Sequence, residues 1–368
     1  MKRYVTRDMA RALKLVMDIG SCGYHVRWSP SHVRAVETDA PESVVRQYYR
    51  VRKNPEITEM EAIKSVTSKS IFSTTNAKAF KSQEAGYLNA VHYLAPATQS
   101  GATSQGVSID ICPSASEACR KACLFTAGSA LYLQSKIKAR VNKTIFLFKE
   151  PQNYLTILGG GIVQTMKDAK NKGMIPAIRL NGTSDLRWEK GMYIPRGPFI
   201  SFRFQETGLN LFETFPDVQF YDYTKIFDRI KPNSEARQYR NYDLTYSYSG
   251  PDSARGGNAT KCRQALDMGV NVAVVFDLGR PFTSYKKFEA KYGKKFEKYK
   301  KKFPQTYFGY PVVDGDVTDL RFTDPNPRQN LRGDRPNGGP VVVALAAKGD
   351  AFADDEGFVV REWKEENN

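Results

Sequence analysis

The sequence has few histidines and no long apolar run. Its 3 histidines in 368 residues form neither an HxH nor an HExxH pattern, which argues against a histidine-metal nuclease and a rolling-circle nickase. A G-x4-GK(S/T) phosphate loop is also missing. No apolar stretch approaches the roughly 20 residues that cross a bilayer, and the basic N-terminus lacks an apolar secretory region. We therefore expect a cytoplasmic protein without a membrane partner.

The sequence also lacks an even set of cysteines. Five cysteines in a reducing compartment are a poor disulfide framework, which leaves metal binding or buried thiols. Three of them, Cys112, Cys119 and Cys123, lie in the stretch CPSASEACRKAC with C-x6-C-x3-C spacing. Three thiolates leave one position on a metal open for a reactant, whereas four close the site. The spacing therefore predicts a shared metal centre, with Cys119 and Cys123 on one face of a helix, and the open position favours an iron–sulfur cluster.

Two other interpretations of these cysteines stay open. A structural zinc needs a fourth ligand, which Cys262 or His92 would supply, although the tight C-x2-C pairs typical of zinc sites are missing. The other alternative is three buried thiols without a metal.

Positive charge is abundant. The 55 Lys and Arg residues exceed the 39 Asp and Glu residues and give a net charge of +16, which favours a nucleic acid or another polyphosphate partner. In the segment 285–303, aromatic residues recur at helical spacing between lysines, so the lysines are either a solvated face or a rail for a phosphate backbone. The rail would use Lys286, Lys287, Lys294, Lys295 and Lys298.

Composition divides the chain into two parts. Residues 1–68 are charged and predict a basic helical extension, with helices near 5–18, 41–53 and 57–68. Residues 69–368 alternate buried strands with helices, which predicts an α/β domain shaped as a (β/α) barrel of the TIM type or a partial barrel. The GGGI stretch at 159–162 is interpreted as a hinge between helices. The expected strands are 87–96, 175–180, 199–204, 218–223, 243–249, 271–277, 311–316 and 341–349.

Polar residues follow several of these strands. Loops after parallel strands meet on one rim, where such folds carry their chemistry. The candidate ligands for the polar part of a cofactor or substrate are Asn181, Thr183 and Ser184. The candidate groups for proton transfer or phosphate charge are Asp185, Lys225, Asp314 and Asp316.

Several motifs coincide in order along the chain: NAKAFKSQEAGYLNAVHYLAPATQSG, CPSAS, CRKACLFTAG, IKARVNKT, RLNGTSDLRWE, FYDYTK, NVAVVF, VVDGDVTDLRF and VALAAKG. Together they resemble the phage-encoded gene product 88-like family over roughly residues 70 to 360. The resemblance implies a phage protein in the cytoplasm of an infected bacterium. It marks the cysteines 112, 119 and 123 and, besides the rim residues above, Arg140, Asp222, Tyr223, Gly315, Asp319, Arg321 and Lys348.

A weaker similarity links the cysteines, followed by Leu-Phe ahead of a series of strands, to radical S-adenosylmethionine enzymes, although those use C-x3-C-x2-C. The leading hypothesis is therefore a metal-cluster enzyme that acts on a nucleic acid or nucleotide-derived substrate, with an iron–sulfur cluster and S-adenosylmethionine. One alternative is a zinc-stapled base-exchange enzyme of the transglycosylase type, with Asp185 or Asp314 as nucleophile. Another is a non-catalytic DNA-binding or replication-associated phage protein. The sequence carries no signal for an oligomeric state.

Overall fold

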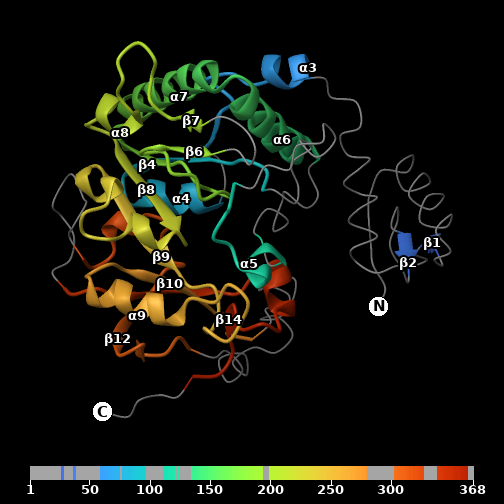
Figure 1. Ribbon diagram of the computed structural model, residues 1–368, viewed down its shortest axis with the longest axis vertical. Helices are drawn as coiled ribbons and strands as arrows, with labels where there is room; N and C mark the ends of the chain where they lie inside the picture. The colour runs from blue at the N-terminus through green and yellow to red at the C-terminus, as the bar shows by residue number, and fades with distance from the viewer. Residues whose placement is uncertain are drawn as a thin grey trace.

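The computed structural model shows a mixed α/β protein built on a ten-stranded, mostly parallel sheet (Figure 1). It describes residues 26–28, 36–38, 59–74, 77–96, 111–121, 123, 134–193, 199–279, 302–326 and 338–363. The strand order is β11 (Thr306–Tyr307), β12 (Tyr310–Asp314), β13 (Val342–Ala346), β10 (Val272–Phe276), β9 (Tyr242–Ser247), β8 (Gln219–Thr224), β5 (Ile175–Arg179), β4 (Tyr87–His92) and β3 (Phe72–Ser73). The tenth strand, β14 (Val359–Val360), pairs with β10.

The predicted α/β class is confirmed, but the sheet is open rather than closed. Strands β4, β5, β8, β9, β10, β13 and β12 are parallel neighbours in that order. The end strands β3 and β11 are two residues long and run antiparallel to β4 and β12. Among the described strands, β3 and β11 do not pair with each other, so no barrel is closed.

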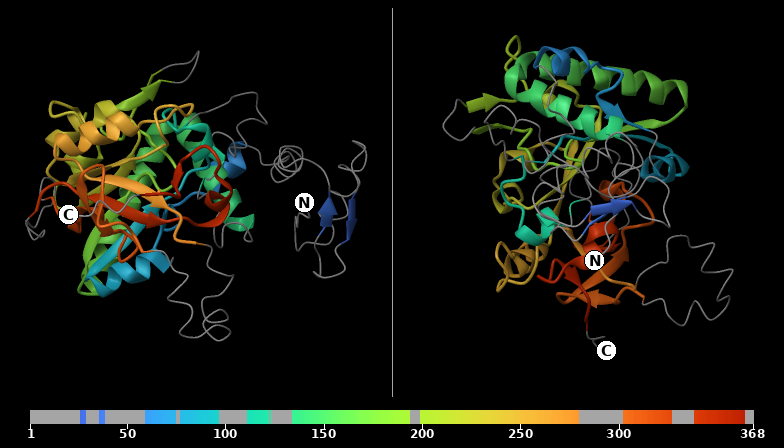
Figure 2. Two further views of the ribbon diagram at one scale, coloured as in Figure 1. Left: turned by 90° about the horizontal axis from the view of Figure 1, so that it is seen from below. Right: turned by 90° about the vertical axis from the view of Figure 1, so that its right-hand side faces the viewer.

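One face of the sheet carries the main hydrophobic core. It is covered by α6 (Gln134–Lys149), α7 (Pro151–Asn171), α8 (Leu211–Thr214) and α9 (Ala259–Asp267). The helices α6 and α7 contact each other and lie side by side, drawn in green in Figures 1 and 2.

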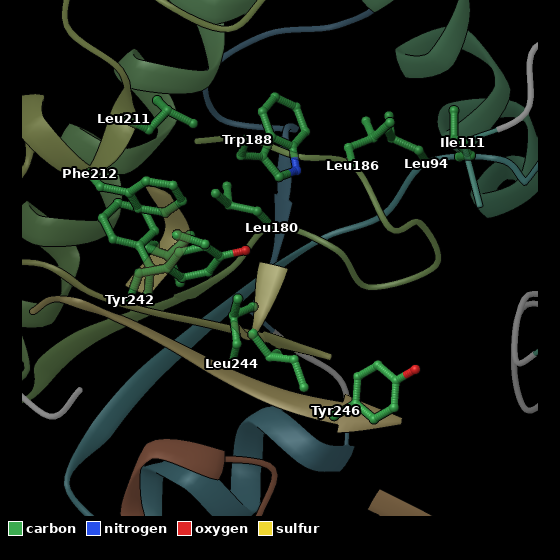
Figure 3. Close-up of a cluster of buried hydrophobic side chains, with 14 of the residues drawn as sticks. Leu94, Ile111, Leu180, Leu186, Trp188, Leu211, Phe212, Tyr242, Leu244 and Tyr246 are labelled. Atoms are coloured by element: carbon green, nitrogen blue, oxygen red, sulfur yellow. The ribbon is translucent and has the colours of Figure 1, made fainter. Parts of the chain in front are cut away.

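Alternation along the strands explains why this face is apolar. In β9, Tyr242, Leu244 and Tyr246 belong to the main core, as expected for a period of two. Figure 3 shows Phe212 of α8 against Tyr242, and the two rings stack with centroids 4.0 Å apart. Each such side chain stabilises the fold by about 1.5–3 kcal/mol when fully buried.

The glycines 159–161 do not form a hinge, because α7 runs through them without a break. A Cβ atom on Gly161 would lie 2.3 Å from Ile71 Cγ2 and 3.0 Å from the Ser68 carbonyl oxygen. The glycine therefore serves close packing of the chain before β3 onto the helix. The sequence pattern alone does not distinguish this role from a hinge.

The other elements complete the description. The strands β1 (Val26–Trp28) and β2 (Val36–Thr38) form an antiparallel pair, and α3 (Glu59–Lys64) packs on α6. The predicted strand at 199–204 forms β7 (Phe199–Ser201), which pairs with β6 (Gly191–Tyr193) outside the main sheet. The predicted helices 5–18 and 41–53 lie outside the described residues. Within the described part of the chain, no helix is both long and apolar enough to cross a membrane.

Candidate functional site at the carboxyl ends of the parallel strands

The rim residues predicted from the sequence do follow parallel strands. Asn181 and Asp185 lie after β5, Lys225 directly follows β8, and Asp314 ends β12. In parallel sheets, this edge is where ligands bind.

The carboxylate of Asp185 is buried and fully bonded. Its Oδ1 accepts hydrogen bonds from Thr224 Oγ1 at 2.9 Å and from Arg229 Nη1 at 3.0 Å. Its Oδ2 accepts from the backbone N–H of Lys225 at 2.8 Å. Asp185 thus fastens the loop after β5 to the end of β8, and both oxygens that a nucleophile would use are engaged.

Asn181 organises the same loop. Its Oδ1 accepts from Ser184 Oγ at 2.8 Å, from the Leu186 N–H at 3.0 Å and from Trp188 Nε1 at 3.1 Å. Its own backbone N–H donates to Asp222 Oδ1 at 2.6 Å. The hydroxyl of Thr183 donates to the Leu94 carbonyl oxygen at 2.6 Å. The polar groups of the three predicted ligands, Asn181, Thr183 and Ser184, therefore form hydrogen bonds within the protein itself.

Arg229 is the buried counterion of this region. Its guanidinium donates to Glu189 Oε1 and Oε2 at 2.9 and 2.8 Å, besides its bond to Asp185. It also donates to Tyr242 OH, which in turn donates to Asp222 Oδ2 at 2.9 Å. Burial raises the pKa of Asp222 to about 7. We call Asp185, Glu189, Asp222, Arg229 and Tyr242 the buried carboxylate network.

The cysteine stretch lies across the carboxyl ends of the strands. The Ile111 carbonyl oxygen accepts from the Asp185 N–H at 2.8 Å, and the Cys112 thiol donates to the Thr183 carbonyl oxygen at 3.7 Å. The short helix α5 (Glu117–Lys121) follows (Figure 1). Its Lys121 pairs with Glu356 ahead of β14. The stretch thus ties the loop after β5 to the segment before β14.

Two of the three predicted metal ligands pack against different hydrophobic clusters. Cys112 packs against the main core, whereas Cys123 packs against a smaller cluster that includes Ile137 of α6. The predicted helical face shared by Cys119 and Cys123 is not formed, because α5 ends at Lys121. Among the described residues, which include all three cysteines, no group of three or more His, Cys, Asp or Glu side chains is placed to hold a metal ion. This arrangement does not fit a shared metal centre.

The two candidate fourth ligands have other partners. Cys262 is buried in α9 with its thiol toward Asn258 Oδ1, and burial raises the pKa of this thiol to about 12. His92 bonds the Leu180 carbonyl oxygen through Nδ1 at 2.9 Å and Tyr154 OH through Nε2 at 2.5 Å. Burial lowers the pKa of His92 to about 3.

Asp314 and Asp316 lie away from Asp185. Strands β13, β10 and β9 separate β12 from β8, and in the described part of the chain Asp314 makes no hydrogen bond or ion pair with Asn181, Asp185 or Lys225. Asp314 is exposed and accepts from the Asp316 N–H at 2.8 Å. Asp316 accepts from the Ala346 N–H at 2.9 Å and pairs with Lys348. These two aspartates shape the turn after β12.

The face of the sheet opposite the main core is polar near this edge. By register, Tyr223 of β8 lies beside Thr245 of β9, and directly after β8 the Lys225 side chain contacts Ser247. The guanidinium of Arg179 from β5 lies 4.6 Å from the ring centre of Tyr223 and pairs with Asp319 at 3.0 Å. We call Arg179, Tyr223, Lys225, Thr245 and Ser247 the β8–β9 polar face.

Within the β8–β9 polar face, several groups lack partners. The hydroxyls of Tyr223 and Thr245 and the Nε of Arg179 are buried and make no hydrogen bond within the described part of the chain. Lys225 Nζ donates to Ser247 Oγ at 2.8 Å and lies 5.7 Å from the ring centre of Phe358.

Strand β14 places Phe358 next to Lys225. Strand β10 pairs with β9 through Val272 and Ala273 and with β14 through Val275 and Phe276. Because β13 occupies the other side of β10, β14 enters between β9 and β10 at their carboxyl ends. Phe358 directly precedes β14 and so reaches Lys225.

The family model described as Gene product 88 matches residues 69–362. The chain belongs to the gene product 88 family. Neither a curated protein nor a solved structure matches it. All residues of the buried carboxylate network and the β8–β9 polar face lie within the span matched by the gene product 88 family.

Five residues of these two groups in this gene product 88 family member were not predicted from the sequence: Thr245, Ser247, Glu189, Arg229 and Tyr242. The first two had a signal: the stretch DLTYSYS alternates polar and apolar residues, which places its hydroxyls on one face of a strand. Arg229 has no local signal, because its partners are distant in sequence. The lysines predicted for phosphate contact, 286, 287, 294, 295 and 298, lie outside the described residues.

Proposed function

We propose that this gene product 88 family member is an enzyme that acts on a nucleic acid or nucleotide-derived substrate at the carboxyl edge of its sheet. One observation carries the proposal. Lys225 is a half-buried cation at this edge, and within the described chain no carboxylate pairs with it, since its only hydrogen-bond acceptor is Ser247 Oγ.

A cation in this position favours an anionic ligand. Its charge is partly removed from water and is not neutralised by the protein, so a phosphate oxygen would gain a charge-assisted hydrogen bond. Open parallel sheets bind ligands outside the carboxyl ends of their strands. The net charge of +16 supports a polyphosphate partner. The lysines of 285–303 would add contacts to the phosphate backbone.

The residues present suggest distinct roles. Lys225 would hold phosphate charge or donate a proton, whereas the Asp316–Lys348 pair would hold the turn after β12, which β13, β10 and β9 separate from β8. Because the three thiols do not fit a shared metal centre, no step of this proposal passes through an iron–sulfur cluster, S-adenosylmethionine or zinc. Base exchange through Asp185 is disfavoured because both carboxylate oxygens are bonded.

The finer shape and setting are part of the proposal. Strands β4, β5, β8, β9 and β10 are neighbours in chain order with the described core helices on one face, which supports a partial (β/α) barrel. The phage resemblance supports a role in the cytoplasm of an infected bacterium.

A second candidate function is a non-catalytic nucleic-acid-binding protein. The bonding of Asp185 favours it, because this residue then serves only to hold loops. Turnover of a bound substrate is the measurement that separates the two candidates.

The binding half of the proposal is tested with Lys225→Met. We expect this variant to bind a fluorescent single-stranded oligonucleotide about tenfold more weakly than the unchanged protein, because a hydrogen bond to a charged group contributes on the order of 1.5–3 kcal/mol. Anisotropy titrations at about 50 and 200 mM salt should also show binding that weakens steeply with salt, as counterion release requires.

Lys231→Met is the matched control. Lys231 lies nearby in sequence but is exposed and paired with Asp228 at 2.6 Å. The variant Lys231→Met should leave the affinity for the oligonucleotide unchanged. Equal losses in both variants, or no binding by the unchanged protein at low salt, would reject Lys225 as the anchor.

A further inference from the structure

Two hydroxyls without partners on the β8–β9 polar face lie between two cations, and the Nε of one of these cations, Arg179, also lacks a hydrogen bond in the described part of the chain. Along the strands toward the carboxyl ends, Arg179 comes first, then the Tyr223 and Thr245 pair, then Lys225. Thr245 is 1% exposed and Arg179 is 7% exposed. Buried polar atoms without a hydrogen bond are rare in native proteins and call for an occupant.

These groups are all hydrogen-bond donors and can therefore bind an anion. The Arg179 Nε carries a hydrogen, the Lys225 ammonium has donors beyond the one used for Ser247, and both hydroxyls donate. Burial raises the pKa of Tyr223 to about 12, so its hydroxyl keeps its proton at neutral pH. Asp319 neutralises part of the Arg179 charge, whereas no carboxylate in the described part of the chain pairs with Lys225.

We infer that the terminal phosphate of the substrate binds between Arg179 and Lys225 and accepts hydrogen bonds from the hydroxyls of Tyr223 and Thr245. This inference rests on the proposed function and narrows its substrate to a nucleotide or an oligonucleotide that ends in a phosphate. The hydroxyls are buried next to Lys225, and an internal phosphodiester has chain leaving on both sides, so a terminal phosphate is the form that such a position would accept.

The test compares oligonucleotides of one sequence with a 5′-phosphate, a 3′-phosphate or hydroxyls at both ends, by isothermal titration with the full chain. We expect one phosphorylated form to bind about tenfold more tightly than the form with two hydroxyl ends, in line with charge-assisted hydrogen bonds. Inorganic phosphate alone should raise the melting temperature of the protein.

The decisive variant is Thr245→Val, which keeps the side-chain shape and removes one hydroxyl. Because this hydroxyl has no partner in the described chain, the free variant should melt no lower than the unchanged protein. It should nevertheless lose most of the affinity gain from the terminal phosphate. Tyr223→Phe should behave in the same way and keep the ring under Arg179.

Thr165→Val is the matched control. Thr165 is also buried, but its hydroxyl donates to the Gly161 carbonyl oxygen at 2.9 Å in α7. This variant should melt lower and keep the full gain from the terminal phosphate.

The failures of the inference and of the proposed function are distinguishable. If all three oligonucleotides bind equally and Lys225→Met weakens them, the groups without partners hold water and only the inference is overturned. If Thr245→Val keeps the full gain, the phosphate lies elsewhere and the inference is again overturned. If no oligonucleotide and no nucleotide binds, the proposed function is overturned as well.

Discussion

Replacing Arg229 by Met is expected to lower the free energy of unfolding by about 3–5 kcal/mol, the usual cost of removing one partner of a buried ion pair. The change leaves the carboxylates of Asp185 and Glu189 buried without their shared cation. Urea unfolding followed by circular dichroism measures the loss. Arg229→Met combined with Glu189→Met should recover part of it, because two buried charges are then removed together.

Arg203→Met is the control for this prediction. Arg203 also bridges two carboxylates, Glu213 at 2.9 Å and Glu235 at 2.8 Å, but its side chain is 36% exposed. Exposed pairs contribute only about 0–1 kcal/mol. Equal losses in Arg203→Met and Arg229→Met would show that burial of the network is not what makes Arg229 important.

The second large effect is the dependence of folding stability on acid pH. Burial lowers the pKa of His92 from 6.5 to about 3, so between these values the unfolded chain binds a proton that the folded protein excludes. The contribution of His92 to stability is therefore complete above pH 6.5 and is lost as pH falls toward 3, by about 1.4 kcal/mol per pH unit.

Asp222 opposes this effect. Its pKa is raised from 3.8 to about 7, so in that window the folded protein holds a proton that the unfolded chain releases, and stability falls as pH rises. The two slopes offset each other in the unchanged protein. His92→Gln, which can still donate to Leu180 and accept from Tyr154, should therefore gain stability relative to the unchanged protein as pH falls below 6.5. Asp222→Asn should show the opposite trend.

Parallel urea titrations of these three proteins at pH 4, 5, 6 and 7 provide the measurement. If the free energy of unfolding changed with pH in the same way for the unchanged protein and for His92→Gln, His92 would not be buried in its neutral form. A stability gain of His92→Gln over the unchanged protein that grows as pH rises, rather than as pH falls, would contradict the prediction.

Much of the sheet was predictable because buried strands leave a local pattern. A continuous apolar run such as NVAVVFD at 271–277 is typical of a strand that is buried on both faces of a sheet, and this run forms β10. Closure into a barrel was not predictable, since it depends on whether the first and last strands meet. No feature of Phe72–Ser73 or Thr306–Tyr307 encodes that the two pairs form opposite edges.

The position of the candidate residues after the strands was predictable, but their bonding was not. Asp185 and Lys225 follow parallel strands, as the sequence indicated. The sequence could not show that Asp185 is fully bonded, because its partner Arg229 lies 44 residues away along the chain. The cysteine spacing indicated a helix through Cys123, but α5 stops at Lys121.

The entry of β14 between β9 and β10 has a consequence for synthesis on the ribosome. Chains emerge from the N-terminus at about 5–20 residues per second, and early segments can fold before later ones exist. Strands β4, β5, β8 and β9 can therefore pair while the remainder is still being made. The surroundings of Lys225 cannot be complete until Phe358 and β14 have emerged. A nascent chain that is still being translated before residue 358 would carry most of its sheet and yet lack a finished site.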